Sequence, residues 1–288
     1  MGTRKVVRLN GVPRPRLVGL PKLVATDLDG TLVRSDYTVS GYTAGVLRRV
    51  RDAGITLVGI TGRGPRLIDL CIEHVVGAHF LVFSQGSYVM EMDHGGPPRV
   101  VRRTVMDGAV ITEAVRLIEA DAGPVQLVVE ALDHPGAPLW ADAGVRWPYP
   151  EACEVRTRGD ALAVPLLKAF VRSPELNSDE LLAVARRVVP PALCGVTHSG
   201  LEFVELSPPG VNKASGLAVV ADSLGIAPEQ TLVFGDMPND VPMFAWAGCG
   251  VAVANAHHEL KAVADEVTQG NDEDGVARYL DRLLVRAA

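Results

Sequence analysis

The chain has 288 residues, which is enough for about two domains. Its net charge of −6 argues against a nucleic-acid partner, and no apolar run approaches the roughly 20 residues of a membrane-spanning helix. Its N-terminus has no apolar signal-peptide core, so we expect a cytoplasmic protein that has no membrane partner and is a monomer or a homodimer.

Residues 1–22 form a basic N-terminal extension. They contain no acidic residue, and their basic residues are Arg4, Lys5, Arg8, Arg14, Arg16 and Lys22. Pro13 and Pro15 interrupt any amphipathic helix, which argues against an organellar transit peptide. Because chain ends are commonly unconstrained, we interpret the extension as a solvated tail or an arm lying on the core, and assign it no function.

Strands and helices alternate along the chain after Lys22. The apolar runs and the helix start and stop residues predict strands 23–27, 55–60 and 80–84 and helices 42–53 and 65–76. Alternation of this kind predicts a parallel sheet covered by helices, so we expect an α/β fold with a Rossmann-like core.

The pattern changes over residues 87–206. There the sequence predicts strands 125–130 and 166–172, a helix over 178–189 and a hairpin of 192–198 with 201–206. We interpret this segment as a separate α+β domain inserted into a discontinuous core of residues 23–86 and 207–288. Such an insert can close over a site and exclude water.

The segment Asp27-Leu28-Asp29-Gly30-Thr31-Leu32 follows the first apolar run of the predicted core. A carboxylate where a buried parallel strand meets a glycine-containing turn lies in the crevice where open α/β sheets bind ligands. An ionised Asp27 is a competent nucleophile near neutral pH, and Asp29 can act as acid and base. The alternative is an ordinary surface turn, because Asp and Gly are common turn residues.

Polar residues follow two further strand-like runs in the same way. Thr61-Gly62-Arg63 follows the run 55–60 and brings a hydroxyl and a cation. Gly235-Asp236-Met237-Pro238-Asn239-Asp240 follows the run 231–234 and brings two carboxylates and an amide. We expect these groups to converge with the first motif on one site.

A lysine begins a predicted helix between these motifs. Asn212 has the character of an N-cap, and the helix is expected to run to Leu224 and to be closed by Gly225. The chain contains 23 Arg but only five Lys, so a cation without a special role would more often be Arg. This favours a specific use of Lys213 as a compact point charge.

Four carboxylates that converge on one site repel one another, so we expect a cation with them. The candidate ligands are all oxygens, which suits a hard ion, and Mg²⁺ that keeps several waters fits few carboxylates better than Ca²⁺ does. A phosphoryl group can then bridge the metal, Lys213, the Thr61 hydroxyl and the backbone N–H groups of the turn after Asp27. The site therefore suits a phosphate ester.

These residues resemble, in order, the four motifs of the haloacid dehalogenase (HAD) superfamily. The matching residues are Asp27-Leu28-Asp29-Gly30-Thr31, Thr61, Lys213 and Gly235-Asp236 through Asn239-Asp240. Within the superfamily the chain is most similar to Cof-type phosphatases with a type IIB cap, and the resemblance extends from Lys22 to the C-terminus. Further matches are Glu205-Leu206-Ser207-Pro208, Ala254-Asn255-Ala256 and Asn271-Asp272-Glu273-Asp274-Gly275-Val276-Ala277.

The resemblance implies a catalytic role for each motif residue. Asp27 is expected to attack phosphorus, forming an aspartyl-phosphate, and to bind Mg²⁺. Asp29 is expected to protonate the leaving alcohol and then deprotonate the hydrolytic water, while its main-chain carbonyl binds the metal. Thr61 and Lys213 are expected to hold the phosphoryl oxygens, and Asp236 to be the third protein ligand of Mg²⁺.

The same resemblance implies supporting roles around the phosphate. Asp240 is expected to orient water on the metal and Asn239 to lie near the phosphate, with Gly30 and Gly62 in the turns that surround it. Arg63 is expected either to contact the substrate or phosphate or to form an ordinary salt bridge. One departure is Gln85, because family members typically carry Asn-Gly at that turn, and we expect it to affect hinge or substrate detail.

The sequence therefore predicts a Mg²⁺-dependent phosphomonoester hydrolase for a small phosphorylated metabolite such as a sugar phosphate. A phosphotransferase or phosphomutase would form the same intermediate and pass the phosphoryl group to a sugar hydroxyl. A non-catalytic phospholigand-binding protein is expected to lack at least one catalytic residue, and none is missing. The histidines and tryptophans of the insert, and the pair His257-His258, show no ligand spacing, so we interpret them as packing or solvated residues.

Overall fold

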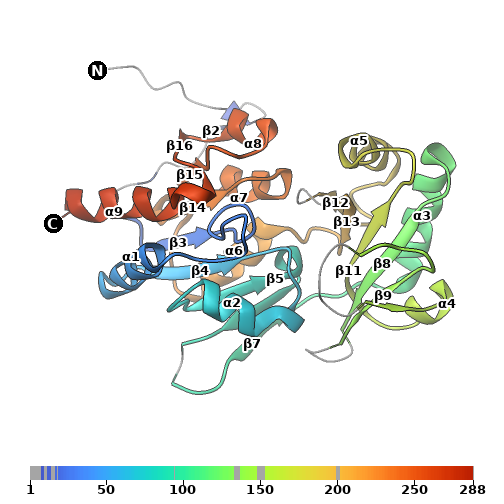
Figure 1. The fold of residues 1–288 in the computed structure, drawn as a ribbon, viewed down its shortest axis with the longest axis horizontal. Coiled ribbons are helices and arrows are strands. Elements are labelled where there is room, and N and C mark those ends of the chain that lie inside the picture. The colour runs from blue at the N-terminus through green and yellow to red at the C-terminus, as the bar shows by residue number, and fades with distance from the viewer. Residues whose placement is uncertain are drawn as a thin grey trace.

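The computed structural model contains two lobes, each built around one β-sheet (Figure 1). It describes residues 8–9, 12–13, 17, 19–93, 95–132, 137–147, 153–198 and 202–287. Most of the basic extension lies outside these residues, as do His94, His134 and the predicted hairpin turn at Ser199-Gly200. In the extension, β1 (Arg8–Leu9) pairs antiparallel with β2 (Val12–Pro13).

The first lobe contains an eight-stranded sheet in the order β16-β15-β14-β3-β4-β5-β6-β7. Its strands are β3 (Leu23–Thr26), β4 (Thr56–Ile60), β5 (Phe80–Phe83), β6 (Tyr88–Glu91), β7 (Arg99–Arg103), β14 (Thr231–Gly235), β15 (Cys249–Ala252) and β16 (Glu266–Val267). The strands from β16 to β5 are parallel, whereas β5, β6 and β7 pair antiparallel. β3 and β14 are buried along their whole length, which explains their almost continuous apolar sequence.

The helices of this lobe follow the expected alternation with the strands. They are α1 (Gly41–Asp52), α2 (Ile68–His74), α6 (Lys213–Ser223), α7 (Val241–Trp246), α8 (His258–Val263) and α9 (Gly275–Ala287). The predicted N-cap is confirmed, because the Asn212 side chain accepts a hydrogen bond from the Ser215 backbone N–H at 3.0 Å. The predicted helix 65–76 is instead a 3₁₀ turn (Pro65–Leu67) followed by the shorter α2.

The second lobe is the inserted α+β cap that the sequence predicted. Its six-stranded mixed sheet has the order β10-β9-β8-β11-β13-β12. The strands are β8 (Gln126–Ala131), β9 (Leu139–Ala141), β10 (Cys153–Val155), β11 (Leu166–Arg172), β12 (Gly195–Thr197) and β13 (Val204–Ser207). Its helices are α3 (Gly108–Ala122), α4 (Arg158–Ala161) and α5 (Ser178–Val188), and α3 and α5 pack together over the sheet's apolar residues.

Part of the segment 87–206 that we assigned to the insert forms two strands of the core sheet instead. β6 and β7 continue the sheet antiparallel to β5. The reason is the turn Ser84-Gln85-Gly86, in which all three residues have positive φ, so the chain reverses at the end of β5. The change from one sheet to the other therefore falls between β7 and α3, later than the expected boundary after Gly86.

The interior of the cap uses its aromatic residues for packing. Trp147 lies edge-on to Phe170, with ring centroids 5.1 Å apart, and also contacts Phe203. Trp140 is buried beneath the guanidinium of Arg156.

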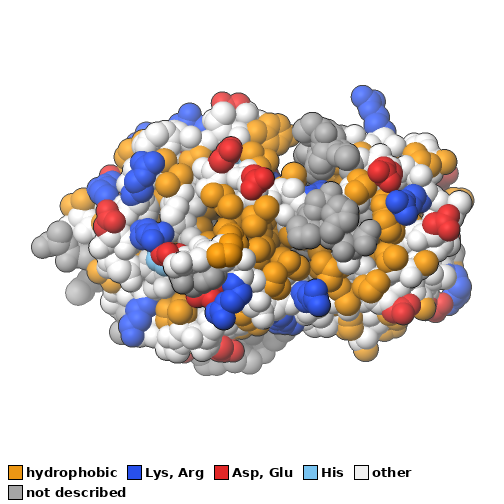
Figure 2. All heavy atoms as spheres, turned by 90° about the horizontal axis from the view of Figure 1, so that it is seen from below, with side chains coloured by type: hydrophobic (Ala, Val, Ile, Leu, Met, Phe, Trp, Pro, Cys, Tyr) orange, Lys and Arg blue, Asp and Glu red, His pale blue; other side chains and the backbone are white. Residues whose placement is uncertain are grey.

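On the face seen in Figure 2, hydrophobic side chains gather between interspersed basic and acidic ones. None of the helices in the described ranges is both long and apolar enough to cross a membrane.

Candidate active site

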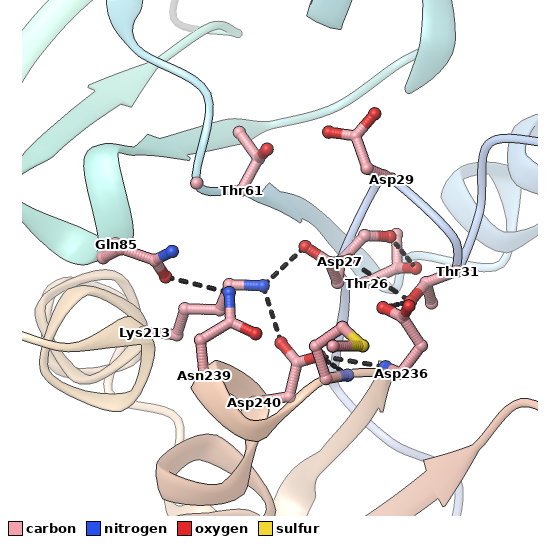
Figure 3. Close-up of polar contacts among 12 residues, drawn as sticks. Thr26, Asp27, Asp29, Thr31, Thr61, Gln85, Lys213, Asp236, Asn239 and Asp240 are labelled. Atoms are coloured by element: carbon pink, nitrogen blue, oxygen red, sulfur yellow. Dashed lines mark hydrogen bonds and ion pairs between the residues drawn. The ribbon is translucent and has the colours of Figure 1, made fainter. Parts of the chain in front are cut away.

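Three neighbouring strands place polar side chains at one edge of the core sheet. β14, β3 and β4 lie side by side and parallel, so the residues that follow their carboxyl ends meet. Asp27 follows β3, Thr61 follows β4 and Asp236 follows β14. Figure 3 shows Lys213 and Asp240 beside them, so the structure brings residues from all four sequence motifs to this edge.

Lys213 is the first residue of α6, and its side chain is fully buried between two carboxylates. Its Nζ donates hydrogen bonds to Asp27 Oδ1 at 2.5 Å and to Asp240 Oδ1 at 2.6 Å. Burial alone would lower the pKa of Lys213, but the charges of Asp240 and Asp27 outweigh it and hold this pKa above its usual range. The ammonium group is therefore a permanent cation in the site.

The Asp27 carboxylate is held on both of its oxygens. Oδ1 accepts from Lys213, and Oδ2 accepts from the Thr31 hydroxyl at 3.2 Å. Burial raises the pKa of Asp27 to about 6, and the neighbouring Asp240 adds to the rise, although Lys213 opposes it. At neutral pH the group is still ionised, which is the state that a carboxylate nucleophile requires.

Asp236 and Asp240 complete a buried acidic triad with Asp27. Candidate ligand oxygens of the three carboxylates all lie within 4.8 Å of one another. Asp240 Oδ2 accepts from the backbone N–H groups of Asp236 and Met237 at 2.9 and 3.0 Å, so its position is fixed. Burial, together with Asp27 and Asp240, raises the pKa of Asp236 well above its ordinary value.

Gly30 allows the first motif to approach this triad closely. A Cβ atom at this position would lie 2.4 Å from Asp236 Oδ2, and the backbone φ is +74°. The Asn255 side chain donates a hydrogen bond to the Gly30 carbonyl at 2.7 Å. Any larger residue would therefore push the Asp27 turn away from Asp236.

The Asp29 side chain does not join the other carboxylates. Arg63 Nε and Nη2 bind its two oxygens at 2.8 and 2.5 Å, and Figure 3 shows the carboxylate pointing away from Asp27 and Lys213. Of the two expected roles of Arg63, the structure therefore shows the salt bridge. The Thr61 hydroxyl accepts from the Arg63 backbone N–H at 3.0 Å, so the same loop also fixes Thr61.

Comparison with known proteins decides the family. The haloacid dehalogenase-like hydrolase family matches residues 24–134 and 153–280. This chain belongs to the haloacid dehalogenase-like hydrolases. The predicted membership and the predicted phosphatase type are both confirmed, since full-length relatives of this HAD protein are named phosphatases.

Two relatives and one solved structure illustrate the similarity. The 5-amino-6-(5-phospho-D-ribitylamino)uracil phosphatase YitU of Bacillus subtilis (strain 168) is 28% identical over 266 residues, covering 90% of this chain and 96% of YitU. YwtE of the same organism carries the same enzyme name and is 27% identical over 293 residues, covering 91% of this chain and 98% of YwtE. The structure of the HAD subclass IIB sugar phosphatase BT4131 has a TM-score of 0.75 and 20% identity, covering 91% of this chain and 99% of that one. This last likeness is one of fold.

The residues of the HAD site fit a divalent cation. Among the described residues, one ammonium group lies between these three buried carboxylates, and of the triad Lys213 binds Asp27 and Asp240. In the described part of the chain, Asp236 has the Thr31 hydroxyl as its side-chain partner at 2.8 Å and forms no ion pair. A buried charge without a counter-ion is costly, and an all-oxygen donor set suits a hard ion. The triad is thus a candidate metal site.

Five polar residues join the cap to the HAD site, and of these only Gln85 was expected to have an effect, on hinge or substrate detail. They are Gln85, Arg66, Glu130, Lys168 and Glu205, of which all but Arg66 are buried. The sequence does contain an indication for the three residues in strands, Glu130, Lys168 and Glu205, because a charged residue within an apolar strand is costly to bury unless it is paired. Which partner each one takes depends on the position of the cap, which no local pattern contains.

Two ion pairs lie where the cap meets the core, one within the cap and one between cap and core. Lys168 of β11 pairs with Glu205 of β13 at 2.9 Å and also donates a hydrogen bond to the Gly62 carbonyl of the core. Glu130 of β8 binds Arg66, and it accepts from the Ser84 hydroxyl at 2.8 Å. Cap strands therefore place charged groups directly beside the loops that contain Thr61 and Gln85.

Histidines also meet at the boundary between cap and core, away from the acidic triad. His198 Nε2 lies 3.0 Å from Asp179 Oδ1, and His257 Nε2 lies 3.8 Å from the same oxygen. Burial lowers the pKa of His198, although Asp179 opposes it. The His257 backbone N–H donates to the Asp236 carbonyl at 2.7 Å, so His257 supports the loop after β14 through its main chain, while its ring packs against His198.

The raised pKa of Asp27 predicts a pH effect on stability. Between its ordinary value of 3.8 and about 6, the folded state holds a proton that the unfolded state has lost, so rising pH lowers the free energy of unfolding of metal-free wild type. Asp27→Asn lacks this titration. From pH 4 to pH 7 the variant should therefore gain stability relative to wild type, by up to about 3 kcal/mol.

Urea unfolding of both proteins in chelator at pH 4, 5, 6 and 7 measures this difference. Titrating groups that do not interact with Asp27 are common to the two proteins and cancel, whereas Asp236, whose pKa Asp27 helps to raise, changes the difference in the same direction. A difference in free energy of unfolding that stays constant with pH would show that Asp27 titrates normally in the folded protein.

Proposed function

We propose that this protein is a Mg²⁺-dependent phosphomonoester hydrolase that forms an aspartyl-phosphate on Asp27 and releases inorganic phosphate. The observation that supports it most directly is the pair of Lys213 with an ionised, buried Asp27 at the carboxyl end of the sheet. This arrangement presents a nucleophile and a cation to the same phosphoryl group.

The residues that would hold the metal are the carboxylates of Asp27 and Asp236 and the main-chain carbonyl of Asp29, with Asp240 supporting them. When bound, Mg²⁺ would supply positive charge to the phosphoryl oxygens and offset the repulsion between these oxygens and the nucleophile. This set is the one implied by the HAD motifs, and the close approach of the triad supports it.

The proposed reaction consists of two displacements at one phosphorus. In the first, a carboxylate oxygen of Asp27 forms a bond to phosphorus as the bond to the leaving oxygen breaks, and Asp29 gives that oxygen a proton. In the second, water attacks the same phosphorus, Asp29 takes its proton, and the bond to Asp27 breaks. Lys213 and the Thr61 hydroxyl hold the phosphoryl oxygens throughout.

Asp29 has to leave Arg63 before it can act in either step. In the structure its carboxylate is held outward by two hydrogen bonds from the guanidinium. A rotation about its side-chain bonds would bring it towards Asp27, because only Leu28 separates them in the chain. Arg63 therefore sets the resting position of the proposed acid and base.

The proposed substrate is a small phosphorylated metabolite with a polar leaving group, such as a sugar phosphate or a phosphorylated ribityl compound. The names of YitU and YwtE support the second of these. Glu130, Lys168 and Glu205 on the cap strands support a leaving group with hydroxyl groups, because the boundary between cap and core contains paired charged side chains rather than an apolar surface.

Hydrolysis is expected to require Mg²⁺ and to be inhibited by Ca²⁺. Ca²⁺ prefers more ligands at longer distances, and it would let Asp27 bind through both carboxylate oxygens, which removes the nucleophile. Phosphate release from a panel of phosphomonoesters, without any acceptor alcohol, measures this with Mg²⁺, with Mg²⁺ plus Ca²⁺, and with excess chelator. Full turnover in chelator would refute metal dependence, and product formation only with an acceptor would indicate a phosphotransferase.

A further inference from the structure

Gln85 lies in a backbone turn that the surrounding structure holds in an unfavourable conformation. It is buried, and its φ is +60°, between Ser84 at +47° and Gly86 at +105°. A non-glycine residue in this region costs about 1–3 kcal/mol and persists only where its surroundings hold it. Here the Ser84 backbone N–H donates to the Arg63 carbonyl at 2.8 Å, and that of Gln85 donates to the Thr61 carbonyl at 3.2 Å.

The turn is also packed against the helix that presents Lys213. A Cβ atom on Gly86 would lie 2.3 Å from the Asn212 carbonyl oxygen, so the glycine permits a close approach of two backbones. The position of Gln85 is thus fixed both by the Thr61 loop and by the start of α6. Its side chain projects towards the boundary with the cap, where it meets Glu205.

The Gln85 side chain forms one hydrogen bond to the core and one to the cap. Its Oε1 accepts from Asn239 Nδ2 at 3.1 Å, as Figure 3 shows, and its Nε2 donates to Glu205 Oε2 at 2.9 Å. Lys168 binds the same Glu205 oxygen at 2.9 Å. A single amide therefore connects the buried ion pair of the cap with the loop that follows β14.

The directions of these hydrogen bonds are set from the cap end. Glu205 accepts from Lys168, so it requires a donor from Gln85, and the NH₂ group must face it. Oε1 of Gln85 then faces Asn239, which must present its own NH₂ group. The Asn239 Oδ1 atom is left buried, and among the described residues it has no hydrogen-bond partner.

This unpaired acceptor lies in the proposed catalytic centre. Asn239 is the neighbour of Asp240, which binds Lys213, and its side chain is buried. A buried acceptor without a donor costs about 1–3 kcal/mol, so a donor from a bound water or ligand hydroxyl is expected there. The orientation of the Asn239 amide therefore determines what this part of the site can bind.

We propose that Gln85 is a positioning residue that makes the orientation of the Asn239 amide depend on Glu205 of the cap. When the cap is closed, Glu205 fixes the Gln85 amide, which turns the Asn239 oxygen towards the bound water or hydroxyl. When the cap moves away, this constraint is lost. The inference rests on the proposed phosphatase function and adds that turnover, rather than only substrate binding, depends on cap closure.

A reciprocal exchange of donor and acceptor tests this. Gln85→Glu places two carboxylates together, and their repulsion should move the side chain at position 85 away from Asn239 and leave its amide free to turn. This should lower kcat for p-nitrophenyl phosphate by about 10- to 100-fold, with KM changed by less than about threefold. Glu205→Gln alone should lower kcat less, because the amide at position 205 still has an oxygen that accepts from Gln85. In the double variant the negative charge moves from position 205 to position 85, where the carboxylate accepts from both neighbouring amides and takes the place of the anion that Lys168 loses, so kcat should recover by about tenfold or more from that of Gln85→Glu.

The recovery is the measurement that a merely structural role would not produce. A double variant at least as impaired as the worse single variant, or a Gln85→Glu protein with wild-type kcat, would overturn the inference. Should Gln85→Glu fail to fold, Gln85→Met removes both hydrogen bonds without adding charge. It should show a similar loss of kcat that Glu205→Gln does not restore, and an unchanged kcat would again overturn the inference.

A second contact between cap and core provides the matched control. Arg186 of α5 and Glu259 of α8 lie 3.7 Å apart, are partly exposed, and do not touch the cluster around Gln85. Glu259→Gln should leave kcat within about twofold of wild type. If it lowers kcat as much as Gln85→Glu, closure alone controls turnover and the role of Gln85 is refuted.

Failure of the proposed function and failure of the inference about Gln85 give different experimental results. Wild-type protein that releases no phosphate from any ester with Mg²⁺ overturns the proposed function and, with it, this inference. Active wild type with a Gln85→Glu variant of equal kcat overturns the inference alone. Melting temperatures of wild type, both single variants and the double variant are measured without metal or substrate. The melting temperature should fall in Gln85→Glu and recover in the double variant.

Discussion

Asp27→Asn is expected to reduce turnover to the uncatalysed background and to form no phosphorylated protein. The substitution keeps the size of the side chain but removes the anionic nucleophile, and it also removes one of the three carboxylates of the triad. Asp240, the other carboxylate that pairs with Lys213, cannot replace Asp27 as nucleophile, because two backbone N–H groups hold it in its own position. The loss should therefore not be rescued by higher Mg²⁺.

The companion variant Asp29→Asn separates nucleophile from acid and base. It keeps Asp27 and its own main-chain carbonyl, and the lost role is worth typically 10²–10⁴-fold. With a leaving group that needs little protonation, the first displacement should suffer less than the second, so a phosphorylated Asp27 should accumulate. Quench-flow and mass spectrometry of intact protein measure it.

An exposed aspartate in the same region serves as control for both variants. Asp36 is exposed, and its hydrogen bonds to Thr38 do not involve the site. Asp36→Asn should leave turnover unchanged. Phosphate found on Asp27→Asn protein, or on any residue other than Asp27 in the Asp29 variant, would show that the nucleophile is a different residue.

Lys213→Met is expected to cause the second large loss, in both activity and stability. It leaves Asp27 and Asp240 buried without their cation, and removal of one partner from a buried pair typically costs about 3–5 kcal/mol. The phosphoryl group also loses a fixed positive charge, and loss of one such donor typically lowers kcat by about 10²–10³-fold. Lys213→Arg should not restore activity, because a planar guanidinium does not fit the fully buried space between two carboxylates.

Denaturant unfolding and steady-state kinetics on the same preparations measure both effects. Lys261→Met is the control, because Lys261 is an exposed residue of α8, and its removal should change neither quantity appreciably. A Lys213→Met protein that keeps wild-type turnover would exclude Lys213 from phosphate binding. A protein that loses activity but keeps its stability would indicate that the two carboxylates are protonated or metal-bound.

The core sheet and its motifs could be predicted because both are local in sequence. Apolar runs such as those that form β3 and β14 define strands, and in a parallel sheet the residues after them meet at one edge. Asn212 and Lys213 could be placed because N-capping is also local. Family resemblance then added the roles, which geometry alone does not determine.

The parts that could not be predicted depend on long-range contacts. The turn at Ser84-Gln85-Gly86 contains two non-glycine residues at positive φ, which no propensity suggests, so the residues that form β6 and β7 were assigned to the insert and not identified as strands. The helix α3 and the strands β9 and β10 were not identified. The outward position of Asp29 follows from the side-chain conformation of Arg63, and nothing in the spacing of the two residues indicates it.

The unequal numbers of carboxylates and cations in the triad have a practical consequence. A cation that binds only the folded chain raises its stability by RT ln(1 + [L]/Kd), where L is the free cation. A melting curve recorded at several concentrations of each divalent ion therefore ranks the affinities of the site without any substrate. Unfolding alone thus shows which ions enter the site and at what concentration each of them, activator or inhibitor, has to be compared in a phosphatase assay.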